Sequence, residues 1–93
     1  MKLLMIDEME ESILPLLKGA NLEIDYKANI KRADALEIIG NYDGLVLRSK
    51  TQVDAEFLGK ASKLKFIGRA GAGIDNIDQA LCEKMGIAIF NAP

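Results

Sequence analysis

The stretch GLVLRSKTQVDAEFLGKASKLKFIGRAGAG, residues 44–73, decides the fold class. It opens with a continuous apolar run at 44–49, which is typical of a central strand in a parallel sheet. A short amphipathic segment follows, whose apolar side chains are expected to line one helix: Val53, Phe57, Leu58 and Ala61. A second apolar run at 64–70 then leads into a glycine-rich turn. This order predicts a strand, a crossover helix and a second, parallel strand.

The same alternation continues toward the N-terminus. Strands are expected at 2–6 and 21–26, the second of them at an edge of the sheet. A helix is expected after the first strand, with Pro15 in its early part and its apolar positions at Ile13, Leu16, Leu17 and Ala20. A second helix is expected to carry Ala33, Leu36 and Ile39 and to end at Gly40 and Asn41.

Toward the C-terminus, the pattern predicts one more helix and one more strand. The apolar positions of this helix, expected on one face, are Ile77, Ala80, Leu81 and Met85. Gly86 is expected to end the helix, and 87–90 is expected to form the last strand.

Five strands that alternate with four helices predict an α/β fold. We expect a flavodoxin-like five-stranded parallel sheet in the order 2-1-3-4-5, with helices on both faces, in one domain of residues 1–93. The chain stops directly after the last strand, although both faces of such a sheet are normally covered. An element that covers the last strand is therefore expected from outside this chain, and the uncovered face is expected to favour self-association.

Composition excludes several classes of function. The net charge of −2 has its signs interspersed, which argues against a nucleic-acid partner. One cysteine, Cys82, and no histidine argue against a disulfide framework and a metal site. Cys82 is expected to be a packing or inert residue. The four apolar residues between Lys2 and Asp7 are too few for a signal peptide or a membrane span, so a cytoplasmic protein is expected.

Ligands in open parallel sheets bind beyond the carboxyl ends of the strands. These ends are expected to carry Asp7 and Glu8, Arg48 and Ser49, Arg69 to Gly73, and Asn91 to Pro93. Two arginines at adjacent strand ends predict an anion pocket, because guanidinium pairs with carboxylate or phosphate through two hydrogen bonds. The turn formed by Ala70, Gly71, Ala72 and Gly73 offers backbone N–H groups to the same anion.

Structural interpretations of these residues stay open beside the functional one. Arg48 and Arg69 can be solvated surface residues, and Gly71 and Gly73 can serve a tight turn alone. Asp75 and Asp78, near the start of the last helix, can be ligands or helix caps. Thr51 or Asp54 is expected to cap the helix before it.

Three nucleotide or phosphate sites known on related folds do not fit. A G-x-G-x-x-G dinucleotide loop is absent, because Asn76 stands where its third glycine should be. A phosphoacceptor receiver domain needs an aspartate where Arg48 stands, although Asp7 and Glu8 resemble its acidic pair. A flavodoxin needs a hydroxyl-rich loop after the first strand, and this sequence has IDEMEES.

LVLRSKTQVDAEFL, LKFIGRAGAGIDNID and GIAIFNAP together resemble the N-terminal segment of the D-isomer-specific 2-hydroxyacid dehydrogenases. The resemblance is strongest to the D-3-phosphoglycerate dehydrogenases of that family, covers the whole chain, and is most specific over 44–93. It implies a lobe of the substrate-binding (catalytic) domain of an enzyme that oxidises a D-2-hydroxy acid to a 2-keto acid with NAD. In the phosphoglycerate-oxidising members, the product feeds serine synthesis.

The resemblance also implies roles for individual residues. Arg48 and Arg69 would bind the phosphate end of the substrate, Ser49 would also contact the substrate, and the backbone of residues 70–73 would hold its carboxylate. The cleft near the cofactor would be lined by Asn91, Ala92 and Pro93. The family's catalytic residues, its nucleotide-binding Rossmann domain and a returning C-terminal helix lie beyond this segment. The chain alone is therefore expected to bind no NAD and to be inactive; a non-catalytic anion-binding or scaffold domain is the alternative.

Overall fold

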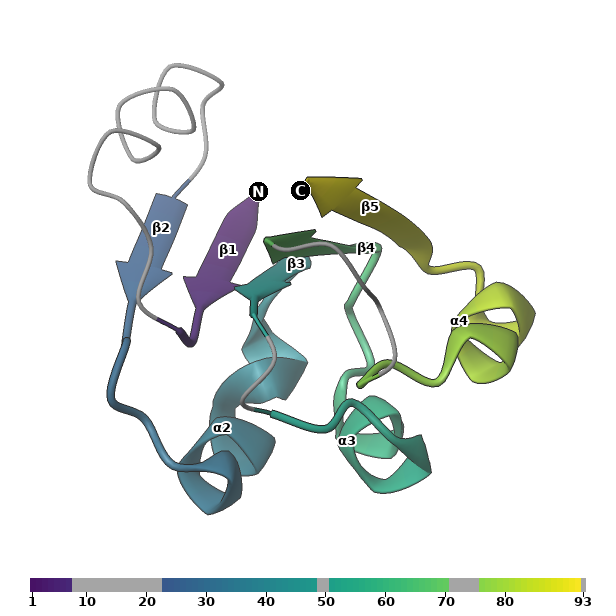
Figure 1. The fold of residues 1–93 in the computed structure, drawn as a ribbon. Coiled ribbons are helices and arrows are strands. Elements are labelled where there is room, and N and C mark those ends of the chain that lie inside the picture. Colours follow the sequence, from purple (N-terminus) through teal and green to yellow (C-terminus); the bar gives the residue numbers. More distant parts are fainter. Residues whose placement is uncertain (8–22, 49–50, 71–75, 93) are drawn as a thin grey trace.

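The computed structural model describes residues 1–7, 23–48, 51–70 and 76–92, which form a parallel sheet with helices packed on it (Figure 1). The strands are β1 (Lys2–Met5), β2 (Glu23–Tyr26), β3 (Gly44–Leu47), β4 (Phe66–Ala70) and β5 (Ala88–Ala92). The α-helices are α2 (Arg32–Ile38), α3 (Ala55–Lys60) and α4 (Gln79–Met85). A 3₁₀ turn, η1 (Ile39–Asn41), continues α2 through the two residues that were expected to end it.

The strand order is β2-β1-β3-β4-β5, which confirms the expected 2-1-3-4-5 topology. Every neighbouring pair is parallel, so each connection must cross over the sheet. β2 lies at an edge of the sheet, as expected. The helix expected around Ile13 to Ala20 lies outside the described residues.

Side chains alternate between the two faces of the sheet and make two separate clusters. On one face, Leu4, Leu45 and Ile67 belong to the large core that also contains Phe57 and Cys82. The helices α2, α3 and α4 all lie on this side of the sheet (Figure 1). On the reverse face, Leu3, Met5 and Val46 form a smaller buried cluster. All four residues of β3 are buried, as its continuous apolar sequence predicts.

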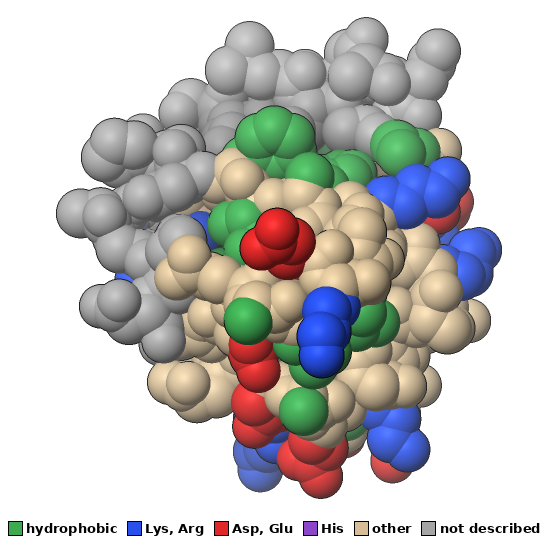
Figure 2. Space-filling view, turned by 90° about the vertical axis from the view of Figure 1, so that its right-hand side faces the viewer, with side chains coloured by type: hydrophobic (Ala, Val, Ile, Leu, Met, Phe, Trp, Pro, Cys, Tyr) green, Lys and Arg blue, Asp and Glu red, His purple; other side chains and the backbone are tan. Residues whose placement is uncertain are grey.

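The reverse face carries exposed apolar surface near the last strand. Phe66 packs against its smaller cluster, and the Phe90 ring stands edge-on to the Phe66 ring with centroids 6.4 Å apart. Phe90 is 62% exposed. Figure 2 shows apolar side chains in the upper part of the described surface, and further ones lower down among acidic and basic side chains. In this view the charged side chains do not gather into a basic patch.

The inward face of α4 differs from the expected one. Leu81 and Cys82 turn toward the core, whereas Ala80 and Met85 are exposed. The expectation was wrong because Ile77 does not belong to the helix. This residue lies before α4 in a bridge to the segment that precedes α3, so it does not fix the rotation of the helix about its axis.

The ends of α3 and α4 follow local sequence signals. Asp54 caps α3 by accepting a hydrogen bond from the Phe57 N–H at 3.1 Å, so Asp54 and not Thr51 is the cap. Asp78 caps α4 through the Leu81 N–H, also at 3.1 Å. Gly86 ends α4 with a positive φ of 73°, a conformation that favours glycine.

Gly44 has no room for a side chain, and Gly59 offers a matched control. A Cβ at Gly44 would overlap the Phe66 ring and lie 2.6 Å from Leu3 Cδ1. We expect Gly44→Ala to lower the free energy of unfolding by about 1–3 kcal/mol, measured by urea denaturation. A Cβ at Gly59 in α3 meets nothing within 4 Å, so Gly59→Ala should raise it by about 0.5–1 kcal/mol. Equal stabilities for the two variants would contradict this packing.

Tyr42 is buried near the amino end of β3, and its hydroxyl donates to Asp25 Oδ2 at 2.5 Å. The Lys2 ammonium lies 5.1 Å from the centre of its ring. Burial, followed by the hydrogen bond to Asp25, raises the pKa of Tyr42 from 10.0 to about 12. The neutral phenol is therefore the form that the folded chain stabilises.

This shift predicts a loss of stability in alkali. Because the pKa of Tyr42 is raised by folding, its contribution is complete below pH 10.0 and is lost as the pH rises toward about 12. Tyr42→Phe should flatten the decline in unfolding free energy over this interval. At neutral pH, Tyr42→Phe should also lower the free energy of unfolding by about 1.5–3 kcal/mol, because the hydrogen bond to a carboxylate is lost. Urea unfolding at a series of pH values measures both effects, and parallel curves for the two proteins would refute the assignment.

Candidate functional site

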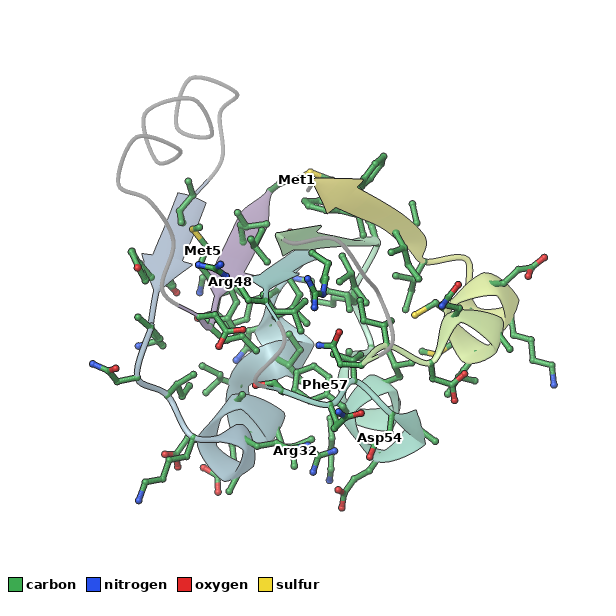
Figure 3. All side chains as sticks on the ribbon, in the orientation of Figure 1. Met1, Met5, Arg32, Arg48, Asp54 and Phe57 are labelled. Carbon is green, nitrogen blue, oxygen red and sulfur yellow. The ribbon has the colours of Figure 1, made fainter. Side chains whose placement is uncertain are left out.

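Two arginines lie at the carboxyl ends of neighbouring strands. Arg48 follows the last residue of β3, and Arg69 is paired with Leu47 in the ladder between β3 and β4. Arg48 is exposed, whereas Arg69 is half-buried. Figure 3 shows Arg48 beside the carboxyl end of β1. The structure thus brings both arginines to the edge of the sheet at which ligands bind in this class of fold.

β3 ends at Leu47, two residues earlier than the expected end at Ser49. The reason is that the Arg48 N–H leaves the ladder and donates to Asp7 Oδ2 at 2.5 Å. Asp7 follows β1 and is only 4% exposed. The sequence analysis placed Asp7 at the end of the first strand but did not predict its contact with Arg48.

Asn76 connects the two arginine segments. Its Nδ2 donates to the carbonyl oxygens of Arg48 at 2.9 Å and Thr51 at 2.8 Å, and its Oδ1 accepts from Arg69 Nε at 3.3 Å. The side chain is buried, and it lies among the few buried polar residues of the described chain. Sequence reasoning missed this role, because it treated Asn76 only as the residue that replaces a glycine. A polar residue between Ile74 and Ile77 was the available signal of a buried, hydrogen-bonded position.

The segment before α3 and the segment before α4 also pair through their backbones. The Val53 N–H donates to the Asn76 carbonyl at 2.7 Å, and the Asp78 N–H donates to the Val53 carbonyl at 2.9 Å. A shallow depression beside this bridge is lined by Gln52, Val53, Asp54, Asn76, Ile77 and Asp78. Since its charged lining is acidic, this depression does not fit an anion.

Arg32 is an arginine whose charge is balanced within the fold. Its guanidinium contacts Asp54 Oδ1 at 2.7 Å and Glu56 Oε1 at 2.9 Å, and its Nε donates to the Gln52 carbonyl. Figure 3 shows Arg32 and Asp54 between α2 and α3. Arg32 therefore joins two helices rather than offering its charge to a ligand, and the sequence did not reveal this network.

The remaining expected site residues lie at the end of the sheet or outside the described chain. Asn91 and Ala92 were expected to follow the last strand, but they belong to β5 and pair with Arg69 and Ala70. Ala70 is the last residue of β4. Residues that lie outside the described ranges are Glu8, Ser49, Gly71, Ala72, Gly73, Asp75 and Pro93. The glycine turn as a carboxylate site therefore stays a prediction.

Nucleophilic and metal chemistry find little support in the described residues. Cys82 is fully buried, and burial, together with the nearby Asp78 charge, raises the pKa of its thiol. The expectation of a packing role for Cys82 is confirmed. No three His, Cys, Asp or Glu residues among those described gather into a metal site. None of the described helices combines the length and apolar character needed to cross a membrane.

Comparison with known proteins gives one consistent result. Residues 3–93 match the family described as D-isomer specific 2-hydroxyacid dehydrogenase, catalytic domain. The chain is 38% identical over 93 residues to D-3-phosphoglycerate dehydrogenase of Archaeoglobus fulgidus. The matched region covers 100% of this chain and 18% of that protein. The chain thus spans less than one fifth of the length of this relative.

Solved structures agree with this match. The NAD⁺-bound 3-phosphoglycerate dehydrogenase of Entamoeba histolytica superposes with a TM-score of 0.87 at 34% identity, over 100% of this chain and 33% of that one. A protein of Pyrococcus horikoshii superposes with a TM-score of 0.91 at 27% identity, over 98% of this chain and 27% of that one.

Proposed function

Because the chain belongs to the D-isomer specific 2-hydroxyacid dehydrogenase family, we propose that residues 1–93 form the substrate-binding lobe of an NAD-dependent oxidoreductase. The parent enzyme oxidises D-3-phosphoglycerate, or a related D-2-hydroxy acid, to the 2-keto acid and supplies serine synthesis. The relative from Archaeoglobus fulgidus, which carries the name of that enzyme, supports the choice of substrate.

One observation carries the proposal: Arg48 and Arg69 lie at adjacent strand ends and are joined through Asn76. D-3-phosphoglycerate presents a phosphate and a carboxylate, and guanidinium groups are well suited to bind both. Arg48 is exposed and can reach a ligand that lies above the sheet edge. Arg69 has its Nε bound to Asn76, which fixes the plane of its guanidinium group.

The residues of this chain do not fit the dinucleotide itself. Asn76 replaces the third glycine of a phosphate loop, and its buried amide is already engaged by Arg48, Thr51 and Arg69. A pyrophosphate would find no close backbone approach at that position. We therefore assign the binding of NAD to the parent's Rossmann domain, and no step of hydride transfer to residues of this chain.

The exposed apolar surface on the reverse face suggests where the parent's C-terminal helix packs. Phe66 and Phe90 lie on that face, and Phe90 is largely exposed. Burying such rings removes apolar area from water and stabilises the contact. The same surface would lead the isolated chain to self-associate.

Direct binding of D-3-phosphoglycerate tests the proposal. In an NMR titration of the isotope-labelled chain, we expect weak, saturable shifts in the amides of residues 70–76, because only one side of the cleft is present. Arg48→Ala should weaken binding by about tenfold or more, since the lost interaction is charge-assisted. Arg32→Ala is the matched control, because Arg32 is paired with Asp54 and Glu56, and it should leave binding unchanged.

D-lactate serves as the control ligand, since it has the hydroxy acid but no phosphate. Equal shifts with lactate would argue for another D-2-hydroxy acid. A well-dispersed spectrum with no shifts at high D-3-phosphoglycerate would overturn the proposed anion site and favour a scaffold domain.

The proposal also predicts that this chain alone does not transfer hydride. Mixing it with D-3-phosphoglycerate and NAD should give no rise in NADH fluorescence, because the dinucleotide site and the catalytic residues lie in other parts of the parent. NADH formation that tracks the purified chain would show that this division of labour is wrong.

A further inference from the structure

We propose that Asp7 and Asn76 are positioning residues that hold the main chain of Arg48, so that its guanidinium starts from a fixed backbone. The inference rests on the proposed function, because it concerns how the same anion site is built. Neither residue was expected to act on Arg48 from the sequence.

The observation is that both polar groups of the Arg48 backbone are bound by buried side chains. The N–H donates to the carboxylate of Asp7, and the carbonyl accepts from the amide of Asn76 at 2.9 Å. These partners lie 41 and 28 residues away in sequence. Asp7 and Asn76 are 4% and 6% exposed, whereas Arg48 itself is exposed. The arrangement therefore clamps the backbone and leaves the side chain at the surface.

Such a clamp matters because Arg48 has left the regular ladder of β3. A residue beyond a strand end is free to change its φ and ψ, and fixing one residue costs roughly 1–2 kcal/mol of conformational entropy. Because the fold already fixes the backbone of Arg48, binding of an anion does not lose this conformational entropy again. A fixed origin also limits where the guanidinium can lie, which improves its alignment with phosphate.

Asn76 does more than hold Arg48, since it also fixes Arg69. The same amide accepts from Arg69 Nε and donates to the Thr51 carbonyl. An ionised aspartate at this position could not donate a hydrogen bond to the carbonyls of Arg48 and Thr51. An alanine would likewise leave both carbonyls without the donor that Asn76 supplies. The buried amide thus sets the spacing between the two arginine segments.

A double-mutant cycle on D-3-phosphoglycerate affinity tests the proposal. Asn76→Ala should weaken binding by about fivefold or more in the unaltered chain. In an Arg48→Ala background it should weaken binding much less, because the group that it positions is gone. Equal weakening in both backgrounds would mean that Asn76 acts only through general stability, and would overturn the inference.

Two further measurements separate positioning from loss of fold. Tyr42→Phe removes a part-buried side-chain hydrogen bond near the amino end of β3, opposite the end that Arg48 follows, and should lower the melting temperature without changing affinity. The Arg69 Nε–H signal, protected from solvent exchange in the unaltered chain, should exchange faster in Asn76→Ala. An unchanged exchange rate in a folded variant would contradict the contact.

Asp7 provides a second, independent arm if Asn76→Ala does not fold. Asp7→Asn keeps a side-chain oxygen that can accept from the Arg48 N–H, so it should retain more affinity than Asp7→Ala. The reverse order, or equal affinities, would overturn the role of Asp7. Absence of binding to the unaltered chain would overturn the proposed function and this inference together, whereas binding that Asn76→Ala leaves intact would overturn the inference alone.

Discussion

Backbone groups beyond the last ladder bond of a buried strand must find a partner other than the next strand, and the end of β3 depends on this constraint. An unsatisfied buried N–H or carbonyl costs about 1–3 kcal/mol, so the fold cannot leave it open. Here the partners are the side chains of Asp7 and Asn76. Because these two residues come from the end of β1 and the approach to α4, satisfying the backbone N–H and carbonyl of one residue, Arg48, also fixes how three segments meet. The two arginine segments, and with them the anion site that we propose, follow from that arrangement.

The central strand beneath this site is closely packed on both faces. β3 is central and buried on both faces, with Leu45 and Leu47 in the large core and Val46 in the smaller cluster. Close packing leaves so little space at Gly44 that the Phe66 ring occupies the position of a side chain. A strand held in this way gives the residue that follows it a well-defined starting point.

Local sequence signals account for most of what could be predicted. Periodicity and glycine turns indicated the strands and their order, and the cap at Asp78 and the end of α4 at Gly86 depend on a few neighbouring residues. The contacts of Asp7 and Asn76 were not predictable in this way, because each partner is far away in the chain and appears only when the sheet is assembled. The same reason explains the error on α4, whose rotation is set by its contact with the core. Arg48 and Arg69 could be predicted as site residues because a strand end is visible in the local sequence. The contact with Asn76 that joins them could not be predicted in this way.

The bridge between Val53 and Ile77 has a consequence for how a local disturbance would spread. Val53 donates to the Asn76 carbonyl and accepts from the Asp78 N–H, so the segment before α3 and the segment before α4 are held together. Asn76 in turn holds the Arg48 carbonyl and the Arg69 side chain. The two arginines are thus sensitive to the packing of the segment before α3, although neither arginine belongs to it.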